Sequence, residues 1–498
     1  MRQINGLKYL LFGVLLLGSA SIALASSSLE EKVVEYQLAN GLKLLVVERH
    51  DTPVVSAYIT IGVGSVHETS ETRGVAHLLE HMLFKGTKTL GTSDYQREKD
   101  LLTQIEAVGS EIDRLKISNP PDTDRLEDLR VQLKELQRVH HPLVVKDEFS
   151  RIYSENGGIG YNAFTSKDQT TYLISLPANK LELWAAIESD RLRNAVLREF
   201  YTEREVVREE RRRSYESRPG GKLYETLLAT AYRFHPYRNP VIGWDSDISN
   251  LTLAETRDFL QRYYAPINTV ICLVGDVDFE QAVAMIDRYF GDIDSGTPVP
   301  PVAEVEPEPT GEKQIRIDFD AEPQMAIAYH KPTLPSREDY VFDLIDMLLS
   351  DGPTSRLYRS LVIEQQLAVS VATYGAPGSR YPNLFVVSAS PRFPHTVEEV
   401  EQAIYVELER LASAPVEKEE LDRVRKRLRT DQLRHLRSNG GLARQLAYYQ
   451  SIAGDWRYLV EYDRVVSGIT AEEVQQVAAR YFSPTNRTVV VLSKEETE

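Results

Sequence analysis

The hydrophobic pattern of the chain is that of a duplicated α+β unit. Apolar and polar positions alternate over residues 54–61 and again over residues 324–331, which predicts a strand in each place. A helical pattern follows each strand, over residues 74–84 and 340–349. We therefore expect an α+β fold of two homologous halves, each an antiparallel sheet with helices packed on one face.

The ends of the two predicted halves indicate the same duplication. Residues 262–275 read RYYAPINTVICLVG, and residues 480–493 read RYFSPTNRTVVVLS. A helical segment that starts at a threonine precedes each string, at Thr252 in the first half and at Thr470 in the second. Chance similarity between two short strings is the alternative.

Breaks in the pattern suggest where the halves begin and end. Residues 296–312 are rich in proline and glutamate and typical of an extended linker, which separates an N-terminal half (26–295) from a C-terminal half (313–498). The first half alone contains a charged insertion, residues 94–139, whose apolar residues recur at helical spacing on both sides of an Asn-Pro-Pro-Asp break. We predict a helical hairpin there, either a solvated spacer or a docking element for a partner.

The first 25 residues have the pattern of a secretory signal peptide. Arg2 and Lys8 precede an apolar run, and small residues follow up to Ala25. We expect cleavage after Ala25 and an exported protein, periplasmic or secreted, with no further membrane span. An uncleaved anchor is the alternative, although the apolar run is shorter than the roughly 20 residues of a membrane span.

Composition narrows the classes of function. The 498 residues include 58 basic and 74 acidic side chains, and the net charge of −16 disfavours nucleic acid and anionic membranes as ligands. Because Cys272 is the only cysteine, the chain cannot form an internal disulfide, a thiolate zinc cluster or an iron–sulfur centre by itself.

The string with the clearest chemistry is GVAHLLEHMLF, residues 74–84. His77 and His81 are four residues apart, so on a helix they lie one above the other, with Glu80 beside them. Two imidazoles at this spacing can hold one divalent ion, and a neighbouring carboxylate can act on water; common zinc proteases have this motif in the reverse order. A helix that merely contains two histidines is the alternative.

A catalytic zinc ion needs a third protein ligand, and the charged helix predicted over residues 203–211 offers carboxylates. Glu203 and Glu210 are seven residues apart, which places both on one face of that helix. A solvated helix with intrahelical ion pairs is the alternative interpretation.

Three motifs in register resemble those of the insulinase/pitrilysin family of inverted zinc metallopeptidases, above all its processing-peptidase-like bacterial members: HLLEH with FKGT, NAFTSKDQTTY, and EREVVREE. The resemblance implies two halves that close as a clamshell and one zinc ion (Zn2+) per chain, held by His77, His81 and Glu210. It implies that Glu80 is the general base and that Glu203 is a second catalytic-site carboxylate, which supports the ligands. The family's two glutamates are seven residues apart, and this spacing favours Glu210 over its neighbour.

In this family an edge strand binds the extended peptide substrate. The resemblance assigns that role here to Asn162, Ala163, Phe164 and Thr165. An ordinary turn residue at Asn162 is the alternative.

The second half departs from the family pattern. Residues 340–349 contain no histidine, so a single metal site is expected. Active single-chain members have an arginine and a tyrosine that hold the substrate carbonyl, whereas this chain has Val362 and Val369 at the matching positions. Since some members carry the zinc motif and the Arg/Tyr pair on different subunits, a homo- or heterodimer with a related chain that carries the pair is a further expectation.

These features together predict a zinc metalloendopeptidase that hydrolyses unfolded or extended peptides. Two alternatives stay open: a zinc-bearing subunit that is inactive without its partner, and a non-catalytic subunit that binds peptides. A structural zinc site is disfavoured because no fourth ligand is evident.

Overall fold

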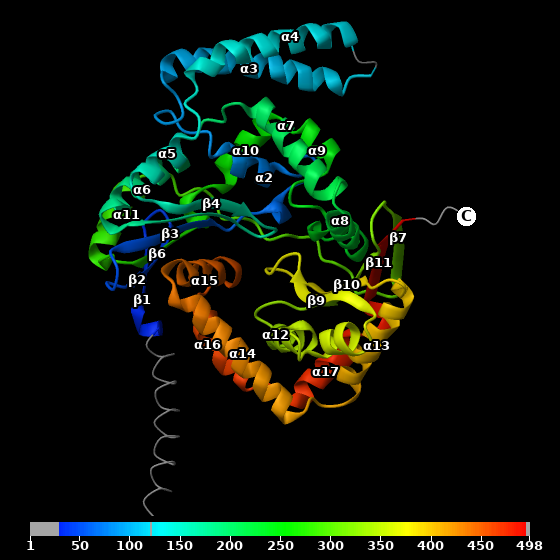
Figure 1. The fold of residues 1–498 in the computed structure, drawn as a ribbon. Coiled ribbons are helices and arrows are strands. Elements are labelled where there is room, and N and C mark those ends of the chain that lie inside the picture. The colour runs from blue at the N-terminus through cyan, green and yellow to red at the C-terminus, as the bar shows by residue number, and fades with distance from the viewer. Residues whose placement is uncertain (1–28, 120–121, 495–498) are drawn as a thin grey trace, which may run out of the picture.

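Two β-sheets, one in each half, organise the chain (Figure 1). The structure is a computed structural model that describes residues 29–119 and 122–494. The first sheet has the strand order β1-β2-β6-β3-β5-β4 and the second the order β7-β11-β8-β10-β9. The strands are β1 (Val33–Gln37), β2 (Lys43–Glu48), β3 (Val54–Ile61), β4 (Ile159–Thr165), β5 (Thr170–Pro177), β6 (Thr269–Gly275), β7 (Lys313–Asp318), β8 (Gln324–Lys331), β9 (Ala368–Ala376), β10 (Asn383–Pro391) and β11 (Arg487–Ser493).

Helices surround both sheets. Those of the first half are α2 (Val75–Met82), α3 (Tyr95–Lys116), α4 (Thr123–His140), α5 (Glu148–Glu155), α6 (Leu181–Asn194), α7 (Phe200–Arg211), α8 (Pro219–Ala231), α9 (Asp245–Asn250), α10 (Leu253–Tyr263) and α11 (Phe279–Phe290). Those of the second half are α12 (Arg337–Ser350), α13 (Val397–Ser413), α14 (Lys418–Arg437), α15 (Asn439–Ala453), α16 (Tyr458–Ser467) and α17 (Ala471–Tyr481). The predicted α+β fold of two homologous halves, arranged like a clamshell, is confirmed.

The two sheets share one topology, apart from the additional edge strand β1. In the first half the last strand, β6, inserts between β2 and β3, and in the second half the last strand, β11, inserts between β7 and β8. Strand β6 therefore corresponds to β11, and the edge strand β4 corresponds to β9. Most neighbouring strands are antiparallel, as expected, but β2 lies parallel to β6 and β11 parallel to β7. Alternation of apolar residues shows which face is buried and carries no information on strand direction, so the sequence pattern does not predict these parallel pairs.

Each sheet is covered on both faces. Helices of the same half cover one face: α2, α6, α10 and α11 in the first half, and α12, α13 and α17 in the second. A helix of the opposite half covers the other face, so α15 packs on β3 and β6, and α8 packs on β8 and β11 (Figure 1). The leucines of these two helices are buried, and burial of each side chain stabilises the fold by roughly 1.5–3 kcal/mol. The exchange of helices therefore interlocks the halves.

The inserted hairpin α3–α4 supports the first half. The ring of Tyr201 on α7 lies so close to Gly109 on α3 that a Cβ atom there would meet it at 2.0 Å. Arg204, also on α7, forms a buried ion pair with Asp113 on α3 at 3.1 Å. Because α3 packs directly on α7, the interpretation of the hairpin as a solvated spacer is wrong for this helix.

A buried charge network fixes the base of the same hairpin. The Glu98 carboxylate on α3 lies 2.8 Å from His140 Nε2, at the end of α4, and accepts a hydrogen bond from Arg198 Nε at 2.7 Å. All three side chains are buried. Arg198 also donates to backbone carbonyls between α2 and α3, including that of Lys85 at 3.2 Å. The network thus ties both helices of the hairpin to the segment that follows α2.

Residues 296–312 form neither helix nor strand and lead directly into β7. The Glu306 carboxylate anchors this segment to the first half, because it accepts hydrogen bonds from the backbone N–H groups of Arg233, Phe234 and His235 at 2.7–2.9 Å. The predicted signal peptide, residues 1–25, lies outside the described residues. Among the described helices, none is long and apolar enough to cross a membrane.

Candidate metal centre and peptide-binding strand

The start of α2 is held firmly in place. Glu68 accepts hydrogen bonds from the backbone N–H groups of Gly74 and Ala76, both at 2.9 Å, and so satisfies two donors of the first helical turn. Gly74 has φ +89°, and a Cβ atom there would lie 2.6 Å from the carbonyl oxygen of Ile242. Apolar side chains between the two histidines and directly after the second one face the core: Leu78, Leu79 and Met82. Their burial turns the opposite face of α2 towards α7.

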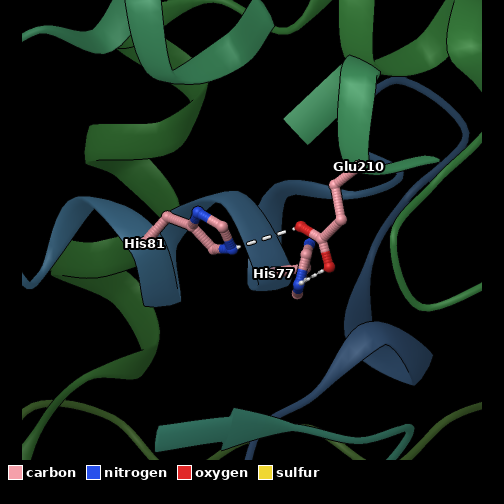
Figure 2. A group of neighbouring side chains, drawn as sticks. All are labelled: His77, His81 and Glu210. Carbon is pink, nitrogen blue, oxygen red and sulfur yellow. Dashed lines mark ion pairs between the residues drawn. The ribbon is translucent and has the colours of Figure 1, made fainter. Parts of the chain in front are cut away.

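Two helices far apart in the sequence bring together three side chains that could hold a metal ion (Figure 2). Glu210 on α7 lies with one carboxylate oxygen 3.8 Å from His77 Nε2 and with the other 3.5 Å from His81 Nε2. One ligand atom from each residue lies within 4.8 Å of the other two. Bonds of about 2.1 Å to a tetrahedral zinc ion would place ligand atoms about 3.4 Å apart, so the arrangement fits such an ion after small side-chain shifts.

The donor chemistry also fits zinc. Burial, together with the neighbouring His81, lowers the pKa of His77 to about 3, so its imidazole is neutral and able to bind a metal. Burial alone would lower the pKa of His81, but the carboxylates of Glu203, Glu210 and Glu80 outweigh that effect and raise it. Two imidazoles and one carboxylate are a typical ligand set for zinc with one position left open.

Glu203 contacts one of the three candidate ligands, His81, and is not itself among them. One of its oxygens lies 2.9 Å from His81 Nδ1, and the other lies 2.5 Å from Lys85 Nζ. Burial would raise the pKa of Glu203, but the hydrogen bonds from His81 and Lys85 prevail and lower it. An ionised carboxylate at Nδ1 keeps the proton on that nitrogen and leaves Nε2 free to face Glu210. Glu209 instead pairs with Arg212 and Arg213, away from the site.

Glu80 lies beside the three ligands and contacts β4. Its Oε2 accepts a hydrogen bond from the Thr165 hydroxyl at 2.6 Å. Burial raises the pKa of Glu80, and Thr165 and His81 oppose this rise without cancelling it. A buried carboxylate with a raised pKa has greater affinity for a proton, as a general base requires.

The four residues predicted to bind substrate lie on β4 but face different surroundings. Among the described residues β4 pairs only with β5, so its other edge is free. Asn162 lines a cavity of about 500 Å³ together with Glu80 and His81. Ala163 packs in the core of the first half, and Phe164 lies under Arg444 of α15, 5.6 Å from ring centroid to guanidinium carbon. Thr165 reaches Glu80, as described above.

The second half contributes no counterpart to this centre. Within residues 29–119 and 122–494, His77, His81 and Glu210 form the one group with metal-binding geometry. Val362 packs against the second core, while Val369 is 60% exposed on the edge strand β9. The nearby Arg356 is bound by Glu420 at 2.6 Å. No polar side chain therefore replaces the absent Arg/Tyr pair at these two positions.

Sequence reasoning assigned no role to two contributors to the site, although one of them, Lys85, lies in the FKGT string. Lys85 is four residues after His81, so the i, i+4 spacing of the predicted helix could have identified it as a neighbour. Glu68, which caps α2, gives no sequence signal, because its two bonds depend on a loop that returns to the helix start.

Family models match both halves of the chain. One, described as Insulinase (Peptidase family M16), matches residues 43–113 and 145–245, and another, described as Peptidase M16 inactive domain, matches residues 250–428. The chain belongs to the insulinase family of peptidases, family M16. The M16 match to the first half includes every residue of the candidate metal centre, whereas residues 114–144, which contain all of α4, fall outside it.

Known M16 proteins resemble the chain over nearly its whole length. The Helicobacter pylori zinc protease PqqE is 26% identical over 463 residues, which cover 91% of each protein. The crystal structure of a protease from Helicobacter pylori has a TM-score of 0.78 at 26% identity, covering 93% of this chain and 99% of that one. The periplasmic protease PqqL from Escherichia coli shares the fold, with a TM-score of 0.69 at 18% identity; the match covers 94% of this chain but 48% of PqqL.

Proposed function

We propose that this M16 protein is a zinc metalloendopeptidase that cleaves unfolded or extended peptides. The observation that carries the proposal is the convergence of His77, His81 and Glu210 within 4.8 Å, with Glu80 on the same face of α2. The relatives named zinc proteases are consistent with this chemistry.

The side chains of the site have distinct parts in the reaction. His77, His81 and Glu210 would hold one zinc ion, which when bound lowers the pKa of water from about 15.7 towards 7 and polarises a carbonyl group. Glu80 takes the proton from the attacking water and passes it to the leaving amine. Glu203 and Lys85 keep His81 in the orientation that this geometry needs.

The free edge of β4 supplies the site for the peptide backbone. An extended peptide that pairs with this edge gains main-chain hydrogen bonds, and Asn162 lies in the cavity next to Glu80. Pairing through the backbone favours extended segments, because most strands of a folded protein already have partners on both sides.

A second candidate is a zinc-bearing subunit that needs a partner for activity. Val362 and Val369 favour it, because they offer no group to hold a substrate carbonyl. We propose a homo- or heterodimer in which a related chain contributes an arginine and a tyrosine. The length of PqqL supports a unit of two such chains, since this chain spans about half of it.

Export to the periplasm or outside the cell completes the proposal. The basic and apolar pattern of the first 25 residues supports it.

The test is hydrolysis of an unstructured, internally quenched peptide by the chain from residue 26 onwards, with zinc content and oligomeric state measured on the same sample. We expect cleavage that is lost with a chelator and in Glu80→Gln, which retains zinc. The matched control is Glu209→Gln, a change on the surface of α7 that leaves cleavage intact. Cleavage by Glu80→Gln at the wild-type rate would overturn the proposed mechanism. Zinc-loaded protein that cleaves only after a related chain is added would favour the second candidate.

A further inference from the structure

A large cleft lies beneath the inserted hairpin. Its volume is about 1080 Å³, twice that of the cavity at the metal centre. One wall is the side of α3 that bears Tyr95, Lys99 and Glu106, together with the end of α4. The opposite wall consists of the end of α6, the start of α7, and α10. The hairpin thus forms one side of a long depression on the first half.

This cleft adjoins the cavity at the metal centre. Lys146, Glu199 and Thr202 line both spaces. Glu80 and His81 line the smaller space, so a peptide held at the metal centre lies next to the cleft across these three shared residues. The buried network of Glu98 and the contact of α3 with α7 anchor the hairpin wall of the cleft to the first half.

The charges in the cleft are unevenly matched. Three acidic residues of its lining already have basic partners: Glu106 pairs with Arg257 at 2.9 Å, Glu199 with Lys85 at 3.8 Å, and Asp292 with Arg193. Asp294 accepts a hydrogen bond only from the backbone N–H of Gly296 among the described residues. By contrast, three lysines of the lining form no ion pair within residues 29–119 and 122–494: Lys88, Lys99 and Lys146.

The lining contains five Lys or Arg and four Asp or Glu side chains, so its charge balance is slightly positive in a protein whose net charge is −16. The three lysines without an ion pair among the described residues come from separate segments: the turn after α2, where Lys88 donates a hydrogen bond to the Asn194 side chain at 3.2 Å, the helix α3, and the loop between α4 and α5. A single terminal carboxylate could reach one of them, whereas several acidic side chains along one extended segment could reach all three.

We propose that this cleft binds an acidic segment of the peptide substrate, adjacent to the residues held at the metal centre. The inference rests on the proposed peptidase function, and it adds a substrate class: peptides with several Asp or Glu residues on one side of the scissile bond. The three lysines determine this specificity by attracting carboxylates, while the apolar part of the lining, including Leu102 and Leu260, contacts the peptide chain.

The experiment measures binding and requires no catalysis. Fluorescent peptides of twelve residues, with both termini blocked, are titrated into metal-free protein and followed by anisotropy. In one set of three peptides, four positions in one half of the peptide are all Asp, all Asn or all Lys. In a second set, the same four residues lie in the other half. One Asn peptide with a free C-terminal carboxylate separates the effect of a chain end from that of side chains.

We expect one of the two Asp peptides to bind at least about tenfold more tightly than its Asn counterpart at low salt, which corresponds to about 1.4 kcal/mol. The preference should disappear at 1 M salt, where charges are screened within about 3 Å. Lys88→Glu with Lys99→Glu should abolish it. The matched control is Lys134→Glu, an equal charge change on the exposed side of α4, which should leave the preference intact.

Three outcomes would overturn the inference. The first is equal binding of Asp and Asn peptides in both placements, and the second is an equal loss of the preference in the Lys134→Glu control. The third is an Asn peptide with a free C-terminal carboxylate that binds as tightly as the Asp peptides. Because binding is measured without metal, failure of the proposed peptidase function can be distinguished from failure of the acidic-segment site. Wild-type protein that prefers Asp peptides but cleaves none would contradict the peptidase proposal and leave the acidic-segment site in place.

Discussion

Removal of the Glu203 carboxylate tests whether a residue that does not bind the metal sets its affinity. In Glu203→Ala, His81 loses an acceptor 2.9 Å from Nδ1, so its ring is free to rotate and to change tautomer. Lys85 loses a partner at 2.5 Å and, within residues 29–119 and 122–494, keeps only Glu199, at 3.8 Å. Its positive charge then lies uncompensated beside the metal centre and repels a divalent cation.

The expected effect is a loss of zinc affinity of about 10- to 100-fold, or about 1.4–2.7 kcal/mol, the range seen when a carboxylate that orients a metal-binding histidine is removed. Glu203→Gln should lose less zinc affinity than Glu203→Ala. The amide oxygen of the glutamine can still accept the hydrogen bond from His81, although the negative charge is gone.

The assay is competition for zinc between the purified protein and a chromophoric chelator of known affinity. Glu209→Gln is the matched control, since it removes a carboxylate from the same helix that pairs only with Arg212 and Arg213. A zinc affinity of folded Glu203→Ala within threefold of wild type would refute the reasoning. An equal loss in Glu209→Gln would show that only the overall charge of α7 matters.

Two further predictions concern stability. Glu98→Gln should lower the free energy of unfolding, measured in urea, by about 3 kcal/mol, because it leaves the buried Arg198 without a counter-charge. The control Glu111→Gln, on the exposed side of α3, should change this free energy by less than about 1 kcal/mol. Equal effects of the two substitutions would contradict the argument. Burial raises the pKa of Asp346 to about 6, although the Thr373 hydroxyl opposes this. The folded state thus holds this proton more tightly than the unfolded state, and the resulting stability is lost as pH rises through about 6. Asp346→Asn should therefore lose less stability than wild type between pH 4.5 and 7.5, and identical pH profiles of the urea midpoint would disprove the assignment.

Short-range features of the site could be predicted from the sequence. The helical repeat alone places His77, Glu80 and His81 on one face of α2, and it places Glu203 and Glu210 on one face of α7. The alternating strands and their repetition likewise predict two related α+β halves. These inferences succeed because they depend on backbone geometry within a few residues, which is the same in every helix or strand.

Other features were decided only by the tertiary structure. The contact of Glu210, rather than Glu209, with the two histidines depends on how α7 lies against α2, and the bond from Thr165 to Glu80 depends on the position of β4. The parallel strand pairs and the exchange of α8 and α15 between the halves have no signal in the periodicity. Periodicity specifies which face of an element is apolar, but which partner buries that face is settled by packing of the whole chain. For this reason the sequence determined the chemistry available on each helix, and the fold determined which groups meet.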